Sequence, residues 1–84
     1  MMTSRRTHIV RDLKQVSADP KAIGRRIRKI RGFDLTQGEF GRILGITQAQ
    51  LSKYELGLSA PTPAMLLRLK AYSGKTIDWI LAGE

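Results

Sequence analysis

A helix-starting pattern occurs twice within a short stretch of this sequence, first at Thr36 and again at Thr47. Each threonine can cap a helix N-terminus, and Glu39 and Gln50 lie three positions after them, so that both patterns are complete capping boxes. Gly45 is the expected end of the first helix, which leaves a very short connection to the second. Two helices joined by so short a connection cross steeply, and this crossing is the geometry of a helix-turn-helix motif.

Further helix signals lie on both sides of this pair. A capping residue followed by proline, which suits the first helical position, occurs twice, and another threonine precedes a short apolar segment. The helices predicted from these signals cover residues 20 to about 31 after Asp19, residues 63 to 72 or 73 after Thr62, and a short stretch after Thr76. No alternation of apolar and polar residues is long enough to predict a strand. The predicted class is therefore all-α, with five helices.

Positive charge is concentrated at the N-terminal end of the chain. Residues 1–31 contain ten Lys/Arg and two Asp, whereas residues 32–84 contain five Lys/Arg and five Asp/Glu, so the net charge of +8 comes from the first part. This one-sided distribution indicates a polyanionic partner. Nucleic acid is favoured over acidic lipid, because the basic helix carries three isoleucines rather than the bulky residues of a membrane-surface helix. We therefore expect no membrane partner.

The chain divides into two parts by its sequence pattern. Residues 1–18 are interpreted as a basic N-terminal arm, and residues 19–84 as the helical domain. Within the arm, Ile9, Leu13 and Val16 have helical spacing. A short amphipathic helix and an arm without a helix therefore remain two open alternatives.

The composition argues against several other classes of protein. The 84 residues suffice for one domain with a modest core and leave no room for a separate catalytic or ligand-binding domain. There is no cysteine and a single histidine, so we expect no metal site and no cofactor. No apolar run approaches the roughly 20 residues of a membrane span, and no secretory signal is evident, which predicts a cytoplasmic protein. Without a nucleophile–base pair or a Gly-rich phosphate loop, the chain is not expected to be an enzyme.

Several motifs of the chain together resemble the Cro/CI-type (XRE) helix-turn-helix family. They are Leu35-Thr36-Gln37-Gly38-Glu39-Phe40-Gly41, Gly45-Ile46-Thr47-Gln48, Leu51-Ser52-Lys53-Tyr54-Glu55, Leu56-Gly57 and Ile77-Asp78-Trp79-Ile80-Leu81. The resemblance covers about residues 20–84 and implies a five-helix, lambda-repressor-like domain that binds double-stranded DNA through its second and third helices, usually as a homodimer on a palindromic operator. The chain departs from the family at Gly41, where alanine is usual, and in the loop of residues 32–34, which is about one residue shorter.

The helix that begins at Gln48 is the expected recognition helix. At 100° per residue, Leu51 and Tyr54 point toward the core, while Ala49, Ser52 and Lys53 point roughly the opposite way. The side chain of Gln48 suits a bidentate pair with adenine, that of Lys53 suits guanine or a phosphate, and that of Ala49 suits the methyl group of thymine. In this docking mode the N-terminal residues of the helix reach base edges, and the predicted base contacts are Gln48, Ala49, Ser52 and Lys53.

Contacts to the DNA backbone are predicted at two other places. The resemblance implies that Gln37, with Thr36, lies over a phosphate at the start of the second helix of the domain. Gln50 is a marginal phosphate contact, because the capping box can occupy its side chain. Arg5 and Arg6 are candidates for an arm that enters the adjacent minor groove, and an arm without a groove role is the alternative.

Two further features have structural interpretations. Arg31 and Glu55 look like the ion pair that joins the first and third helices of the domain in the family, so loss of either partner is expected to destabilise the fold. Trp79 is interpreted as core or dimer packing rather than as a stacking platform for bases.

The leading functional prediction is a sequence-specific repressor or autoregulator that acts as a homodimer. One alternative is the antitoxin of a toxin–antitoxin pair, which would bind DNA through the same helix and a toxin or other protein through a different surface. Another alternative is a protein-binding adaptor that has lost its DNA, which the neutral charge of residues 32–84 supports. Salt dependence separates the adaptor from the DNA binders, because phosphate contacts weaken steeply as salt rises.

Overall fold

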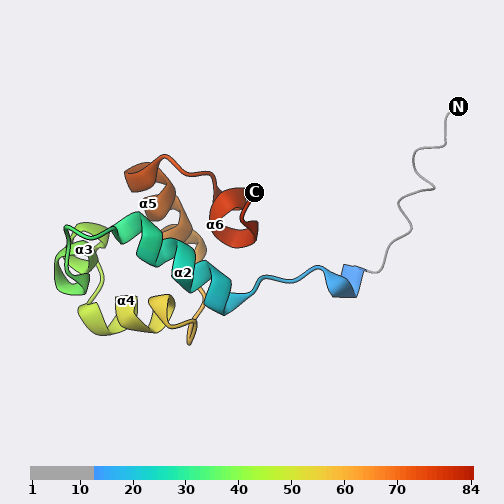
Figure 1. Ribbon diagram of the computed structural model, residues 1–84, viewed down its shortest axis with the longest axis horizontal. Helices are drawn as coiled ribbons and strands as arrows, with labels where there is room; N and C mark the ends of the chain where they lie inside the picture. Colours follow the sequence, from blue (N-terminus) through green and yellow to red (C-terminus); the bar gives the residue numbers. More distant parts are fainter. Residues whose placement is uncertain (1–12) are drawn as a thin grey trace, which may run out of the picture.

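Five α-helices succeed one another along residues 13–84, the part of the chain that this computed structural model describes (Figure 1). They are α2 Pro20–Arg31, α3 Gln37–Leu44, α4 Gln48–Glu55, α5 Pro63–Ser73 and α6 Ile77–Ala82. A 3-10 turn, η1, covers Leu13–Gln15, and no strand occurs between residues 13 and 84. The prediction of an all-α domain with five helices is confirmed.

Only the last part of the predicted arm belongs to the described residues. Leu13 and Val16 are both exposed there, and Figure 1 shows η1 well away from the five helices. Arg5, Arg6 and Ile9 lie outside the described residues. The groove role of the two arginines and the amphipathic helix around Ile9 therefore stay predictions.

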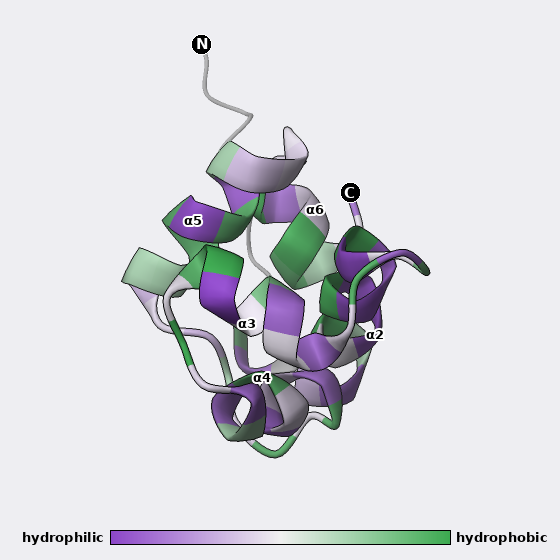
Figure 2. Ribbon diagram, turned by 90° about the vertical axis from the view of Figure 1, so that its left-hand side faces the viewer, coloured by the Kyte–Doolittle hydropathy of each residue, from purple (hydrophilic) through white to green (hydrophobic). Residues whose placement is uncertain are grey.

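The core lies where all five α-helices meet, and each helix contributes to it. Its buried apolar side chains are Ile23, Ile27, Phe40, Leu44, Leu51, Met65, Leu69 and Ile80. Figure 2 shows hydrophobic and hydrophilic residues alternating around the helices, as expected when each helix buries one face. None of the helices in the described part is both long and apolar enough to cross a lipid bilayer.

The short helix α6 docks on this domain through one fully buried side chain and one hydrogen bond. Ile80 is completely buried, and its carbonyl oxygen accepts a hydrogen bond of 3.0 Å from Nη1 of Arg26 in α2. Trp79 is half-buried and packs against the core, as the sequence predicts. A helix as short as α6 is not stable in isolation, so these contacts account for its presence.

Helices α2 and α4 approach each other so closely that only glycine fits at the crossing. A Cβ atom on Gly24 would lie 2.5 Å from the carbonyl oxygen of Tyr54 and closer still to that of Glu55, and both of these atoms belong to the backbone. Gly41, the position at which the family usually has alanine, is also tight, since a Cβ there would lie 2.9 Å from the carbonyl oxygen of Ile46. Contact without intervening side chains thus sets the position of α4 against its neighbours.

Candidate nucleic-acid interface

Local hydrogen bonds close the turn between α3 and α4. Gly45 adopts the left-handed conformation (φ 78°, ψ 29°), and Ile46 N–H donates to the carbonyl oxygen of Gly41 over 2.8 Å. Glycine reaches this conformation without steric cost, so the chain can reverse within a very short connection. The steep helix crossing predicted from the sequence follows from this turn.

Both predicted capping boxes are formed. In α4, the side chain of Thr47 accepts from Gln50 N–H over 3.1 Å, and Gln50 Oε1 accepts from Thr47 N–H over 3.0 Å. In α3, the corresponding distances between Thr36 and Glu39 are 3.1 and 2.9 Å. These bonds satisfy backbone donors that the first turn of a helix otherwise leaves unpaired, so the N-terminus of α4 is held in one geometry.

The outer face of α4 gathers the four side chains that the sequence predicts to contact bases. Gln48, Ala49 and Lys53 are exposed and Ser52 is half-buried, while Leu51 on the opposite side is fully buried. The structure thus brings the four residues together on one accessible ridge of a capped helix. Their contacts with bases stay a prediction.

The predicted phosphate-contacting side chains already make hydrogen bonds within the domain. Gln37 Nε2 donates to Glu55 Oε1 over 3.0 Å, Gln50 Oε1 is held in the capping box, and the oxygen of Thr36 accepts from Glu39 N–H. A side-chain amide has two N–H donors and a hydroxyl keeps its own hydrogen, so Gln37 and Thr36 can each still donate to a phosphate oxygen. Their role toward DNA stays a prediction.

Arg31 and Glu55 form a bidentate ion pair that joins α2 to the C-terminal end of α4. The distances are 2.7 Å from Nε to Oε2 and 2.8 Å from Nη2 to Oε1, and the side chains are only 14% and 4% exposed. Arg31 also donates to the carbonyl oxygen of Leu35 over 3.0 Å. Together with the hydrogen bond from Gln37, this network ties α2, α3 and α4 to a single carboxylate.

The electrostatics of this network favour the charged form of both partners. Burial acts to raise the pKa of Glu55, but hydrogen bonds from Arg31 and Gln37, with the positive charges of Arg31 and Arg28, outweigh burial and hold that pKa below its ordinary value. The hydrogen bond to Glu55 raises the pKa of Arg31, against a smaller opposing effect of burial. The pair therefore stays ionised at neutral pH and fixes the orientation of α4.

Gly24 is a positioning residue that the sequence interpretation did not identify. It lies on the face of α2 that meets the last turn of α4, where a side chain would strike the backbone. A glycine inside an otherwise regular helical pattern is a signal of such close approach. Ser59 and Ala60 were likewise not predicted, and they line a hollow of about 220 Å³ beside Gln50, Lys53 and Tyr54.

The comparison with protein families identifies the class of protein that this arrangement defines. The helix-turn-helix family model matches residues 25–80, which include α3, the turn and α4. The chain belongs to the helix-turn-helix family of Cro/CI (XRE) type, and is a DNA-binding regulator rather than an enzyme. A comparison with curated protein sequences finds no match.

A solved structure of the same type shares this fold. The P22 c2 repressor, in complex with synthetic operator 9T in the presence of Tl+, superposes with a TM-score of 0.67 at 27% sequence identity. The match covers 74% of this chain and 96% of the repressor chain. The lambda-repressor-like architecture expected from the sequence is therefore confirmed.

Proposed function

We propose that the protein is a sequence-specific repressor or autoregulator that places α4 in the major groove of double-stranded DNA and acts as a homodimer on a palindromic operator. The observation that carries the proposal is the ridge of Gln48, Ala49, Ser52 and Lys53 on a capped helix anchored at its other end. Such a ridge presents hydrogen-bonding and apolar groups in fixed order, which direct readout of bases requires. The similarity to a repressor solved with an operator supports the same conclusion.

The chemistry of the ridge assigns a role to each side chain. Gln48 pairs with adenine, Ala49 contacts a thymine methyl group, and Lys53 binds guanine or a neighbouring phosphate. Ser52 can donate or accept, so it suits either kind of base edge. Occupation of the operator then excludes polymerase, and this exclusion needs no chemistry beyond binding.

Contacts outside the ridge position the domain on the duplex. Thr36 and Gln37 donate to a phosphate at the start of α3, where the N-terminal N–H groups of the helix also favour an anion. Gln50 contributes only the N–H donors of its side-chain amide, because its oxygen is already bonded to Thr47. The arm places Arg5 and Arg6 in the adjacent minor groove.

Selection of bound sequences from random duplex DNA tests the proposal. A homodimer selects a palindrome whose half-sites lie about one helical turn, roughly 34 Å, apart. Gln48→Ala and Lys53→Ala change the selected base at one position, whereas Gln37→Ala weakens all sequences alike. Because Gln48 and Lys53 are exposed, circular dichroism should show their variants folded. The assignment of α4 as recognition helix is wrong if Gln48→Ala leaves both affinity and preference unchanged.

A further inference from the structure

A second polar surface runs along α2 toward α5 and α6, beside the face of α2 that meets α4. Helix α2 lies between α4 and the pair α5 and α6, and α4 packs against α2 and α3 (Figure 1). Two hollows open along this surface, one of about 880 Å³ beside α5 and α6 and one of about 490 Å³ along α2, and Lys29 lines both. We call this continuous region, which extends from Phe33 through Lys29 to Lys75, the α2–α6 surface.

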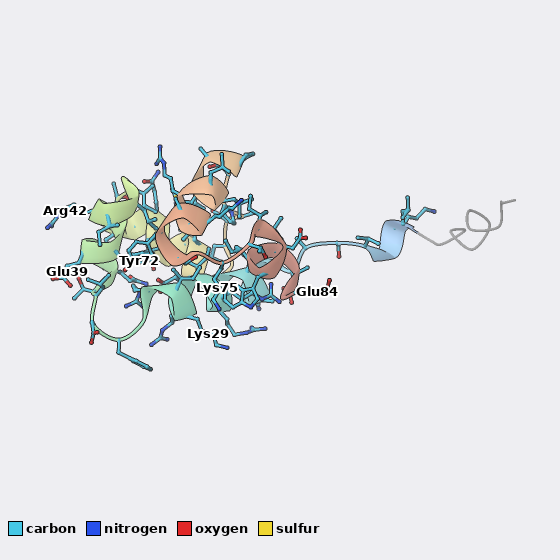
Figure 3. The ribbon with its side chains drawn as sticks, turned by 90° about the horizontal axis from the view of Figure 1, so that it is seen from above. Lys29, Glu39, Arg42, Tyr72, Lys75 and Glu84 are labelled. Carbon is cyan, nitrogen blue, oxygen red and sulfur yellow. The ribbon has the colours of Figure 1, made fainter. Side chains whose placement is uncertain are left out.

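The larger hollow combines aromatic walls with positive charge. Ile30, Tyr72 and Trp79 provide its apolar parts, and Lys29 and Lys75 provide its cations. Lys75 Nζ lies 4.8 Å from the ring centroid of Trp79, so one cation is already held over an aromatic face. Figure 3 shows Lys29, Tyr72 and Lys75 on the same side of the domain.

The smaller hollow repeats this combination at the other end of the surface. Arg25, Arg28 and Lys29 line it together with Phe33, and Phe33 is fully exposed to solvent. An aromatic side chain that buries nothing contributes little to the stability of its own domain, and exposed aromatic groups are typical anchors of protein interfaces. Phe33 therefore suits a contact with another molecule.

The cations of the α2–α6 surface form no ion pair within the described part of the chain. Arg25, Arg28, Lys29 and Lys75 are exposed and make no ion pair among residues 13–84, and no carboxylate lines either hollow. Complementary charge at an interface steers association and selects the partner. The occupant that this surface favours therefore carries negative charge.

The apolar walls of the two hollows, and the place of the larger hollow relative to α4, favour a protein over DNA as the molecule that binds this surface. DNA held by the outer face of α4 is separated from the larger hollow by α2, so the duplex that the ridge binds does not reach it. The aromatic and aliphatic walls also need apolar side chains, which a phosphate backbone lacks. We propose that the α2–α6 surface binds an acidic, amphipathic segment of a partner protein while α4 remains available for DNA.

Titration of the whole chain with two synthetic peptides tests this proposal. In the first peptide leucine and tryptophan alternate with glutamate, and in the second serine replaces leucine and tryptophan at the same net charge. The amphipathic peptide should bind, and the serine peptide should bind about tenfold more weakly because it cannot fill the apolar walls. Nuclear magnetic resonance should locate the shifted amides at Phe33, Lys29 and Lys75.

Variants of single exposed residues assign the contacts. Phe33→Ser and Lys29→Glu should each weaken the amphipathic peptide about tenfold, the first through lost apolar contact and the second through charge reversal. Arg42→Glu, which also reverses an exposed cation near a helix end but lies on α3, is the matched control and should change affinity by less than about twofold.

Two outcomes would overturn the proposal. If both peptides bind equally and Phe33→Ser has no effect, the surface attracts negative charge without recognising an apolar segment. If an operator-free DNA duplex displaces the amphipathic peptide and loses affinity in Lys29→Glu, the surface is a nucleic-acid contact. Operator selection by α4 is measured separately, so failure here leaves the proposed DNA-binding function standing.

Discussion

Replacement of Gly24 by alanine tests the claim that backbone contact sets the position of α4. Gly24 is buried, and an added Cβ would meet the carbonyl oxygens of Tyr54 and Glu55 at 2.5 Å or less. Neither oxygen can move aside as a flexible side chain would, because both belong to the last turn of α4. The two helices must therefore separate, which loosens the packing of Ile23 and Ile27 against the rest of the core.

Two opposing effects determine how much Gly24→Ala changes the free energy of unfolding. Alanine gains about 1 kcal/mol over glycine in helix propensity. Overpacking of a well-packed site costs about 1–3 kcal/mol, and a rigid backbone obstacle places Gly24 at the upper end of that range. We therefore expect Gly24→Ala to lower the free energy of unfolding by about 2 kcal/mol, which corresponds to a decrease in Tm of about 10 °C for a domain of this size.

Two glycines of the neighbouring helix α3, Gly38 and Gly41, provide matched controls. A Cβ on Gly38 would meet only Thr36 Oγ1, at 3.9 Å, so Gly38→Ala should stabilise the domain by up to about 0.5 kcal/mol. Gly41, where a Cβ would lie 2.9 Å from a backbone oxygen, should give a value between the two. Urea denaturation measures all three. Equal stability of Gly24→Ala and the parent chain, or equal losses for Gly24→Ala and Gly38→Ala, would refute the reasoning.

Three further predictions concern the charge network, the cap of α4 and the core. The pKa of Glu55 in the folded protein lies below the value of about 4.3 in the unfolded chain, so its stabilisation is complete above that pH and is lost as pH falls through the folded-state pKa. Denaturation as a function of pH should show this acid loss in the parent and a shallower one in Glu55→Gln. Thr47→Ala should cost about 1 kcal/mol by removing the cap, and weaken operator binding in a titration. Leu69→Ala should cost about 2–5 kcal/mol in urea denaturation, because Leu69 is fully buried.

The elements of the fold could be predicted because their signals are local. Each α-helix between residues 20 and 82 begins after Asp or Thr, and the cap side chain accepts from a backbone N–H of the first turn in every case. A cap depends on residues within one helical turn, so the sequence alone contains the whole interaction. The ridge on α4 followed for a similar reason, since helical periodicity relates Leu51 to the residues opposite it.

The main features that sequence reasoning missed depend on contacts between segments far apart in the chain. Gly24 is constrained by the backbone of α4, and Gln37 is bonded to Glu55, a partner eighteen positions away. Sequence analysis considered Phe33 only as part of the short loop of residues 32–34, whereas the structure leaves it exposed at the end of the α2–α6 surface. Local propensity contains no information on which distant segment will lie against a given side chain.

The stability of this domain and the DNA specificity proposed for it depend on separate sets of residues. Helix α4 is too short to be stable alone, so its orientation comes from Gly24, the Thr47 cap and the bond between Arg31 and Glu55. The ridge residues are mostly exposed, and substitutions at such positions usually change stability by less than about 0.5 kcal/mol. If the ridge reads bases as proposed, base preference can therefore change there while the fold persists, because the interactions that hold α4 lie on its inner face and at its ends.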